Sequence, residues 1–167
     1  MIDELHTYIH SLRRYAYVLC RNAADSDDLV QETLTKAIAR AQTFRAGMDL
    51  RAWLFGILHN TFVSDKRQYA RRARAAKFLE NAVPEPDTTS DQEKHVEAET
   101  TIRMLSRLTA DQQAALILVA VEGLSYEEAA AILDVPVGTL MSRLARGREQ
   151  LRRLVRGQDP SPLRAVR

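Results

Sequence analysis

A pair of capping boxes in the second half of the chain constrains the fold more than any other feature of the sequence. Thr109 is followed at the third residue by Gln112, and Ser125 is followed in the same way by Glu128. In such a pair the two side chains satisfy backbone N–H groups that the first turn of a helix otherwise leaves without partners. We therefore expect two helices to begin close together, one just after Thr109 and one just after Ser125.

The residues around these two starts indicate where the helices end. Gly123 fits the stop of the first helix, and the second covers about Tyr126 to Leu133. Pro136 suits the beginning of a third helix that runs to about Leu154. A helix, a short helix, a tight turn and a longer helix together predict a helix-turn-helix unit.

The last of these helices has one apolar side and one side that suits the major groove of DNA. At 100° per residue its leucines share one sector, and the opposite side begins with small or polar residues and continues with arginine. Small residues let the backbone approach DNA, and arginine can bond two acceptors of one guanine, which discriminates by about 1–3 kcal/mol. A solvated basic surface is the alternative. The candidate DNA-binding residues of this helix are Thr139, Ser142, Arg143 and Arg146.

The first half of the chain also predicts helices. Apolar residues from Leu5 to Leu19 keep the spacing of one helix face, and a second helix starts at Asp25 or Ser26. Asp49 can cap a third helix, which continues past Arg67 as a basic stretch. For the second helix we expect an apolar stripe of Val30, Leu34, Ala37, Ile38 and Ala41.

A change in the sign of the charge along the sequence marks the boundary between the two halves of the chain. The net charge is only +2, but residues 51–77 are strongly basic, whereas residues 85–99 carry six acids and one base. Pro84 and Pro86 disfavour a helix in the acidic segment. We predict an all-α protein with two small helical domains joined by a flexible linker, and with a tail that is disordered by default. The predicted boundaries are 1–82 for the first domain, 83–95 for the linker, 96–156 for the second domain and 157–167 for the tail.

Several classes of protein are disfavoured. No apolar run reaches about 18 residues, so we expect no membrane insertion, and the charged first twenty residues do not resemble a signal peptide. The single cysteine, Cys20, fits a reducing cytoplasm and is expected to be a small buried side chain. We therefore expect a cytoplasmic protein.

Catalytic and metal sites are also not expected. His6 and His10 are four residues apart on one helix, but no further ligand stands at a matching spacing nearby. Asp27 and Asp28 are adjacent and so face different directions on a helix. With no nucleophile–base arrangement and no Gly-rich phosphate loop, we expect a non-enzymatic protein without metal or cofactor.

Four motifs occur in an order and spacing that resemble those of the extracytoplasmic-function (group IV) sigma factors. They are Asp27–Glu32, Arg51–Leu54 with Asn60 after it, Leu124–Ala130 and Val137–Thr139. The resemblance covers about residues 5–78 and 100–155, and the stretch from Phe44 to Asp65 resembles the general-stress subgroup of alphaproteobacteria. Members of the family bring RNA polymerase to promoters and help to open them.

The resemblance implies a sigma region 2 domain followed by a sigma region 4 domain. Region 2 of the family binds the clamp helices of the polymerase β′ subunit, which implies the polymerase-binding residues Asp28, Leu29, Gln31 and Glu32. Region 4 of the family reads the −35 element as duplex and docks on the β flap. Many members carry Lys or Arg where this chain has Met141, and methionine cannot donate a hydrogen bond to a phosphate or a guanine.

Region 2 of the family also holds the −10 element as a single strand. Capturing an unstacked base requires a shaped pocket and hydrogen bonds to the base edge. Asn60 is the candidate for a base edge, and the candidates for the phosphates are Lys66, Arg67 and Arg71. Trp53 and Phe62 fit core packing better than stacking on a base, for which Tyr69 is the better candidate.

The partners implied by the resemblance are core RNA polymerase, promoter DNA and an anti-sigma factor that holds the two domains. Two alternatives stay open at this point. A sigma-like decoy would sequester an anti-sigma factor without binding DNA, and a stand-alone helix-turn-helix repressor would bind a palindrome as a dimer. The acidic linker fits either a mimic of nucleic acid in the polymerase channel or a plain soluble tether.

Overall fold

The computed structural model describes residues 4–45, 47–77 and 104–157, without the side chains of residues 69–77. Every regular element in these ranges is helical, so the all-α class is confirmed. The predicted linker and tail lie almost entirely outside the described residues. In chain order the elements are α1 (Leu5–Cys20), α2 (Ala23–Ala39), the 3-10 turn η2 (Ala41–Thr43), α3 (Leu50–Lys77), α5 (Ala110–Leu116), the π-helical turn η3 (Ile117–Val121), α6 (Tyr126–Ile132) and α7 (Val137–Val155).

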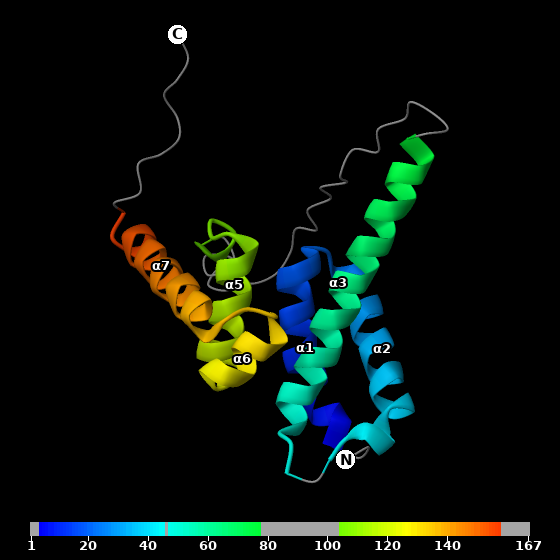
Figure 1. The fold of residues 1–167 in the computed structure, drawn as a ribbon. Coiled ribbons are helices and arrows are strands. Elements are labelled where there is room, and N and C mark those ends of the chain that lie inside the picture. Colours follow the sequence, from blue (N-terminus) through cyan, green and yellow to red (C-terminus); the bar gives the residue numbers. More distant parts are fainter. Residues whose placement is uncertain (1–3, 46, 78–103, 158–167) are drawn as a thin grey trace.

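The first unit is a bundle of α1, α2 and α3 (Figure 1). At its centre the rings of Tyr15 and Phe55 pack with their centroids 5.4 Å apart, and both side chains are completely buried. The Asp49 carboxylate accepts hydrogen bonds from the backbone N–H groups of Arg51 and Ala52, at 2.7 and 3.3 Å. The predicted cap of the third helix is therefore confirmed.

The second unit is the helix-turn-helix that the two capping boxes predict. Both boxes are formed, with Thr109 and Ser125 as the N-cap residues of α5 and α6. Gly123 has φ +69°, a left-handed conformation that glycine adopts without steric cost. The helix before Gly123 is not α-helical throughout, because η3 widens its last turn and the N–H of Glu122 donates to the carbonyl of Ile117 at 2.9 Å.

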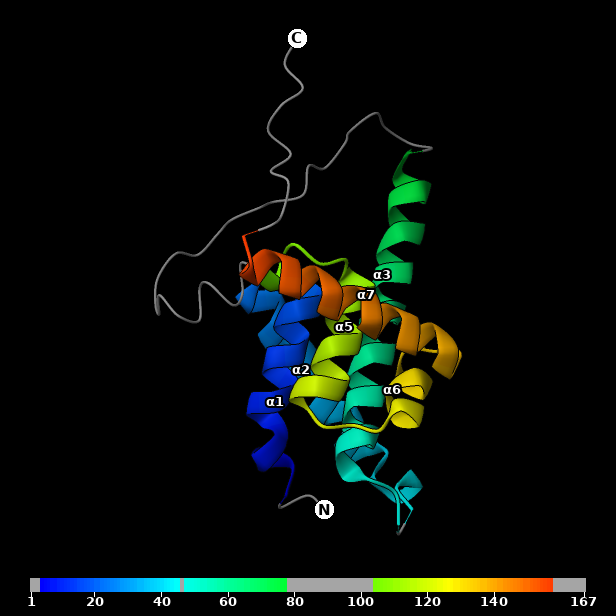
Figure 2. The same ribbon diagram turned by 90° about the vertical axis from the view of Figure 1, so that its left-hand side faces the viewer.

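The two units pack against each other in what we call the closed arrangement. Helix α5 contacts α1, and α6 contacts α3, whereas α2 lies on the far side of the first unit (Figures 1 and 2). Buried apolar side chains of both units form one continuous core cluster. The sequence predicts the two units but contains no pattern that predicts this contact between them.

Two expectations for α2 are wrong. The helix begins at Ala23 rather than at Asp25 or Ser26, because the side chain of Asn22 accepts from the Asp25 N–H at 3.2 Å and so caps the helix earlier. Ile38, expected in the apolar stripe, is exposed, whereas Thr33 is buried. The Thr33 hydroxyl donates to the carbonyl of Leu29 at 2.7 Å, so its polar atom is satisfied inside the bundle.

Candidate functional site

Helix α7 is held on the second unit by a narrow apolar seam. Leu140 and Leu144 are completely or almost completely buried, and Gly147 lies directly on α5. A Cβ atom at Gly147 would lie 2.9 Å from Cδ1 of Leu116 and 3.5 Å from Cβ of Gln112. This close approach fixes which side of α7 faces away from the protein.

The opposite side of α7 carries the predicted DNA-binding residues. Thr139, Ser142 and Arg146 are exposed, and Arg146 has no ion-pair partner in the described part of the chain. The Ser142 hydroxyl donates to the carbonyl of Gly138 at 3.0 Å. Arg143 is half-buried, and its Nη2 lies 2.8 Å from the Asp111 carboxylate on α5. The four residues therefore share a helix, but only Arg146 offers an uncommitted guanidinium.

The basic end of α3 separates into two faces. Asn60 and Arg67 are exposed, and seven residues at 100° each place them within about 20° of one another around the helix. Lys66 points elsewhere, because its ammonium lies over the Phe62 ring, 5.6 Å from the centroid. Arg71 is on the described backbone of α3, but its side chain lies outside the described residues. The structure thus brings Arg67, and not Lys66, onto the face of Asn60.

An acidic pocket of about 580 Å³ lies between the end of α1, the start of α2 and the middle of α3. No residue of the second unit lines it, so it stays accessible in the closed arrangement. Its lining residues are Leu19, Cys20, Asp25, Asp28, Leu29, Glu32, Phe62, Asp65 and Lys66. An apolar floor with four carboxylates and one ammonium group favours a partner that presents both apolar and basic side chains.

The polymerase-binding residues predicted from the resemblance fall on and beside this pocket. Asp28 and Glu32 line it, Gln31 is exposed nearby on α2, and Glu32 also forms an ion pair of 2.6 Å with Lys36. Leu29 is only 6% exposed. Its side chain also lines the pocket, where it forms part of the apolar floor, so the expected polymerase contact at Leu29 stays a prediction.

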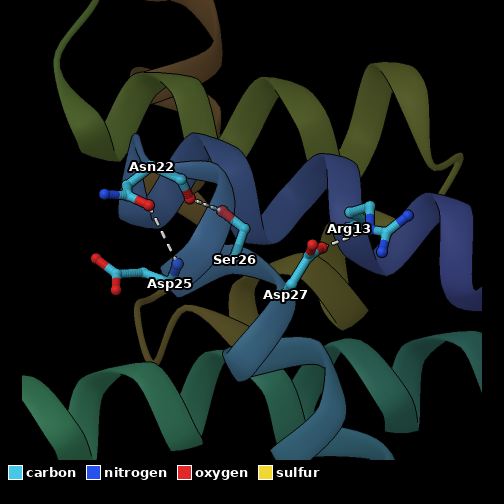
Figure 3. A network of polar contacts seen from close by, with 5 residues as sticks. All are labelled: Arg13, Asn22, Asp25, Ser26 and Asp27. Carbon is cyan, nitrogen blue, oxygen red and sulfur yellow. Dashed lines mark hydrogen bonds and ion pairs between the residues drawn. The ribbon is translucent and has the colours of Figure 1, made fainter. Parts of the chain in front are cut away.

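A network of polar contacts sets the start of α2 against α1 (Figure 3). Asn22 caps the helix through the N–H of Asp25, and the Ser26 hydroxyl donates to the carbonyl of Asn22. Arg13 on α1 donates from Nε to the Asp27 carboxylate at 2.6 Å. Asp27 therefore turns toward α1 while its neighbour lines the pocket, which agrees with the expectation that the two carboxylates diverge.

Cys20, Trp53 and His59 are half-buried and pack at the edge of the core, so the expectation that Cys20 is fully buried needs correction. Burial, followed by the charge of Asp25, raises the pKa of the Cys20 thiol to about 11, so the thiol stays protonated. His59 Nδ1 lies 3.0 Å from the Tyr15 hydroxyl, and burial lowers the pKa of His59 although the charge of Asp111 opposes this. Trp53 packs on Phe44 with ring centroids 5.2 Å apart, as the core interpretation predicts.

Two absences hold for the described ranges. Their His, Cys, Asp and Glu side chains form no group of three that could hold a metal ion. None of the helices described there is both long and apolar enough to cross a membrane.

Glu122 joins the two units, and no local pattern predicts this role. Its side chain is 3% exposed and accepts from Nε and Nη2 of Arg14 on α1, at 3.0 and 2.5 Å. The Glu122 carbonyl accepts from the guanidinium of Arg51 on α3. We call these three residues the interunit clasp. Arg51, which the sequence places at the start of the basic stretch of residues 51–77, therefore contributes to the contact between the units.

Two domain families match the chain. Residues 5–59 match the Sigma2 domain of PhyR, and residues 99–151 match Sigma-70, region 4. A protein of Rhodopseudomonas palustris named "ECF RNA polymerase sigma factor EcfG" is 42% identical over 155 residues, covering 92% of this chain and 83% of that protein. The chain belongs to the extracytoplasmic-function sigma factors. It is an alternative sigma factor of RNA polymerase, and the resemblance to the general-stress subgroup is confirmed.

Solved structures of sigma factors share this fold. The sigma factor RpoE of Bartonella quintana, solved with the anti-sigma factor NepR, is 34% identical with a TM-score of 0.74, and the match covers 94% of this sigma factor and 97% of that chain. CnrH, solved with the cytosolic domain of CnrY, is 25% identical with a TM-score of 0.64, covering 94% and 88% of the two chains. Region 2 thus corresponds to α1–α3 and region 4 to α5–α7.

Proposed function

We propose that this sigma factor reads the −35 duplex with α7, holds the opened −10 strand on the Asn60 face of α3, and binds core polymerase through the acidic pocket. The observation that carries the proposal is the placement of these three surfaces. All three are exposed in the closed arrangement, and each has the chemistry that its partner requires. By the resemblance, the polymerase element at the pocket is the pair of β′ clamp helices, and region 4 also meets the β flap.

The proposal also covers regulation of the sigma factor by a partner protein and its location in the cell. An anti-sigma factor holds the RpoE relative in its solved complex, and the backbone likeness to that chain supports the same kind of partner here. The sigma factor would act in the cytoplasm, where polymerase and promoters meet. It would contribute binding and strand capture but no catalysis of its own.

A decoy function is the second candidate, because the match over residues 5–59 is to a domain of PhyR. An anti-anti-sigma PhyR is also a structural neighbour, at 17% identity, which shows the shared fold alone. Run-off transcription with core polymerase, this protein and a promoter library separates the two functions. A sigma factor gives transcripts that depend on the protein, whereas a decoy gives none and does not bind core polymerase.

Replacing Arg146 with alanine should weaken −35 discrimination. Arg146 is an exposed guanidinium on the side of α7 that faces away from the core, where it can bond a guanine edge. Losing one such contact costs about 1–3 kcal/mol, or roughly 5- to 150-fold. The measurement is competition between the selected −35 sequence and single-base variants, using holoenzyme. Arg153→Ala is the matched control, because Arg153 already pairs with Glu149 at 3.2 Å. Equal discrimination by the Arg146 variant and the wild type would remove Arg146 from the reading surface.

Replacing Asn60 with alanine should weaken promoter opening more than initial binding. The amide is exposed on α3 and can bond the edge of an unstacked base, which exists only after the strands separate. Permanganate reactivity of −10 thymines measures opening, and a filter-binding titration measures the closed complex. His10→Ala is the control, because it removes an exposed polar side chain from α1. Normal permanganate reactivity in the Asn60 variant would show that the assignment is wrong.

A further inference from the structure

An apolar strip runs along α7 beside the polar residues that face DNA. Val137, Met141 and Ala145 are spaced by four residues, so they follow one another along a single line of the helix. Met141 is 51% exposed and Val137 is 36% exposed, and Ala145 is exposed as well. None of the three packs into the core of the second unit, whose seam uses Leu140 and Leu144.

The polar half of the same surface has few groups left for reading bases. The Ser142 hydroxyl is engaged by the carbonyl of Gly138, and the guanidinium of Arg143 is engaged by Asp111. Thr139, Arg146 and Arg148 remain, and of these only Thr139 lies in the first turn of the helix. The first turns therefore offer few polar groups to base edges, so a larger share of the selectivity there must come from the apolar strip.

The major groove offers one apolar group that such a strip can recognise. Thymine carries a C5-methyl group there, and apolar side chains that contact it distinguish thymine from the other bases. The strip occupies the first turns of α7, which are the turns that meet base edges in helix-turn-helix proteins. The exposed arginines 146 and 148 stand next to it, which suits phosphates and does not suit an apolar protein partner.

We infer that Met141, supported by Val137, is a specificity-determining residue that reads thymine methyl groups in the −35 element. The inference rests on the proposed role of α7 and adds the base that is read. This role explains the methionine at position 141, where many members of the family carry Lys or Arg. A thioether cannot donate a hydrogen bond but packs well against a methyl group. We expect each contacted methyl group to change binding by about fourfold, the amount expected for burying one such group.

The test replaces thymine by deoxyuridine, which removes the methyl group and keeps base pairing. Holoenzyme first selects a −35 duplex from a random library, and each thymine of that duplex is then exchanged singly. Wild-type holoenzyme should bind about fourfold more weakly at one or two positions. At those positions Met141→Ala should bind thymine and uracil equally, and Met141→Leu should keep the difference.

The control is Val155→Ala, which removes an apolar side chain that is 70% exposed at the other end of α7. It should behave as the wild type. Binding of the wild type that is unaffected by every exchange would overturn the inference while leaving α7 as the −35 reader, and so would a full methyl effect in Met141→Ala. If the holoenzyme selects no duplex at all, the proposed function fails and the inference fails with it.

Discussion

Replacing Arg14 with alanine will shift the equilibrium from closed toward open molecules, whereas replacing its neighbour Arg13 will not. The Glu122 carboxylate is 3% exposed, and its charged partner is the Arg14 guanidinium at 2.5 Å. A carboxylate that loses such a partner must be exposed to water or stay buried without compensation. Because the Arg14 side chain is itself 40% exposed, we expect a cost of about 1–2 kcal/mol, below the 3–5 kcal/mol of fully buried pairs. The ratio of closed to open molecules should fall about tenfold.

Arg13 provides a matched control one residue away on the same helix. It pairs with Asp27 at 2.6 Å inside the first unit, and both side chains are exposed. Small-angle X-ray scattering of the full-length protein measures the outcome, since opening raises the radius of gyration. Wild type and Arg13→Ala should scatter alike, and Arg14→Ala should be more extended. Identical scattering from all three proteins would show that the clasp does not hold the units together.

The closed arrangement matters because it cannot contact a whole promoter. Positions −35 and −10 are about 25 base pairs apart, which is about 85 Å at a rise of 3.4 Å for each base pair. A compact body the size of the described residues, about 130 in number, has a radius of gyration of about 14 Å and a diameter of about 36 Å. Region 2 and region 4 must therefore separate before both promoter elements are bound. The interunit clasp opposes that step, so Arg14→Ala should also reach promoters more readily in the presence of core polymerase.

The sequence predicts features whose causes are local. A capping box involves residues three apart, so Thr109 and Ser125 locate two helix starts without any knowledge of the fold. Gly123 ends the preceding helix because its backbone is left-handed. The side of α7 that faces away from the core follows from helix periodicity alone, which is why Arg146 is exposed where the sequence predicts it.

Features that depend on distant residues are not predictable in this way. The burial of Glu122 requires Arg14, which is 108 positions away in the chain. The π-helical turn before Glu122 carries no sequence pattern that distinguishes it from an α-helix. Leu29 lines the pocket together with Asp28 and Glu32, and only the packing of three helices shows that it is almost completely buried. The two faces of α3, with Lys66 on one and Arg67 on the other, likewise become clear only from their surroundings.

Replacing Gly147 with valine will destabilise region 4. The Cβ atom would stand 2.9 Å from Leu116 Cδ1 and 3.5 Å from Leu116 Cγ, and Leu116 is buried with little room to move. Valine adds two further methyl groups to this contact, so α7 must shift away from α5. Overpacking of this kind costs about 1–3 kcal/mol, and we expect the upper part of that range. The melting temperature measured by circular dichroism should fall by about 5–10 °C.

The same substitution at Gly138 serves as the comparison for Gly147→Val. Gly138 lies in the first turn of the same helix, it is exposed, and a Cβ atom there would meet nothing within 4 Å. Gly138→Val should therefore melt within about 2 °C of the wild type, since valine is no worse than glycine in a helix. It should nevertheless weaken −35 binding more than tenfold, because branched bulk at this point prevents the close approach of α7 to the major groove. Glycine at position 147 would then be required for the stability of region 4, and glycine at position 138 for binding the −35 duplex. If Gly138→Val bound the −35 duplex normally, α7 would have to approach DNA through a different part of its surface.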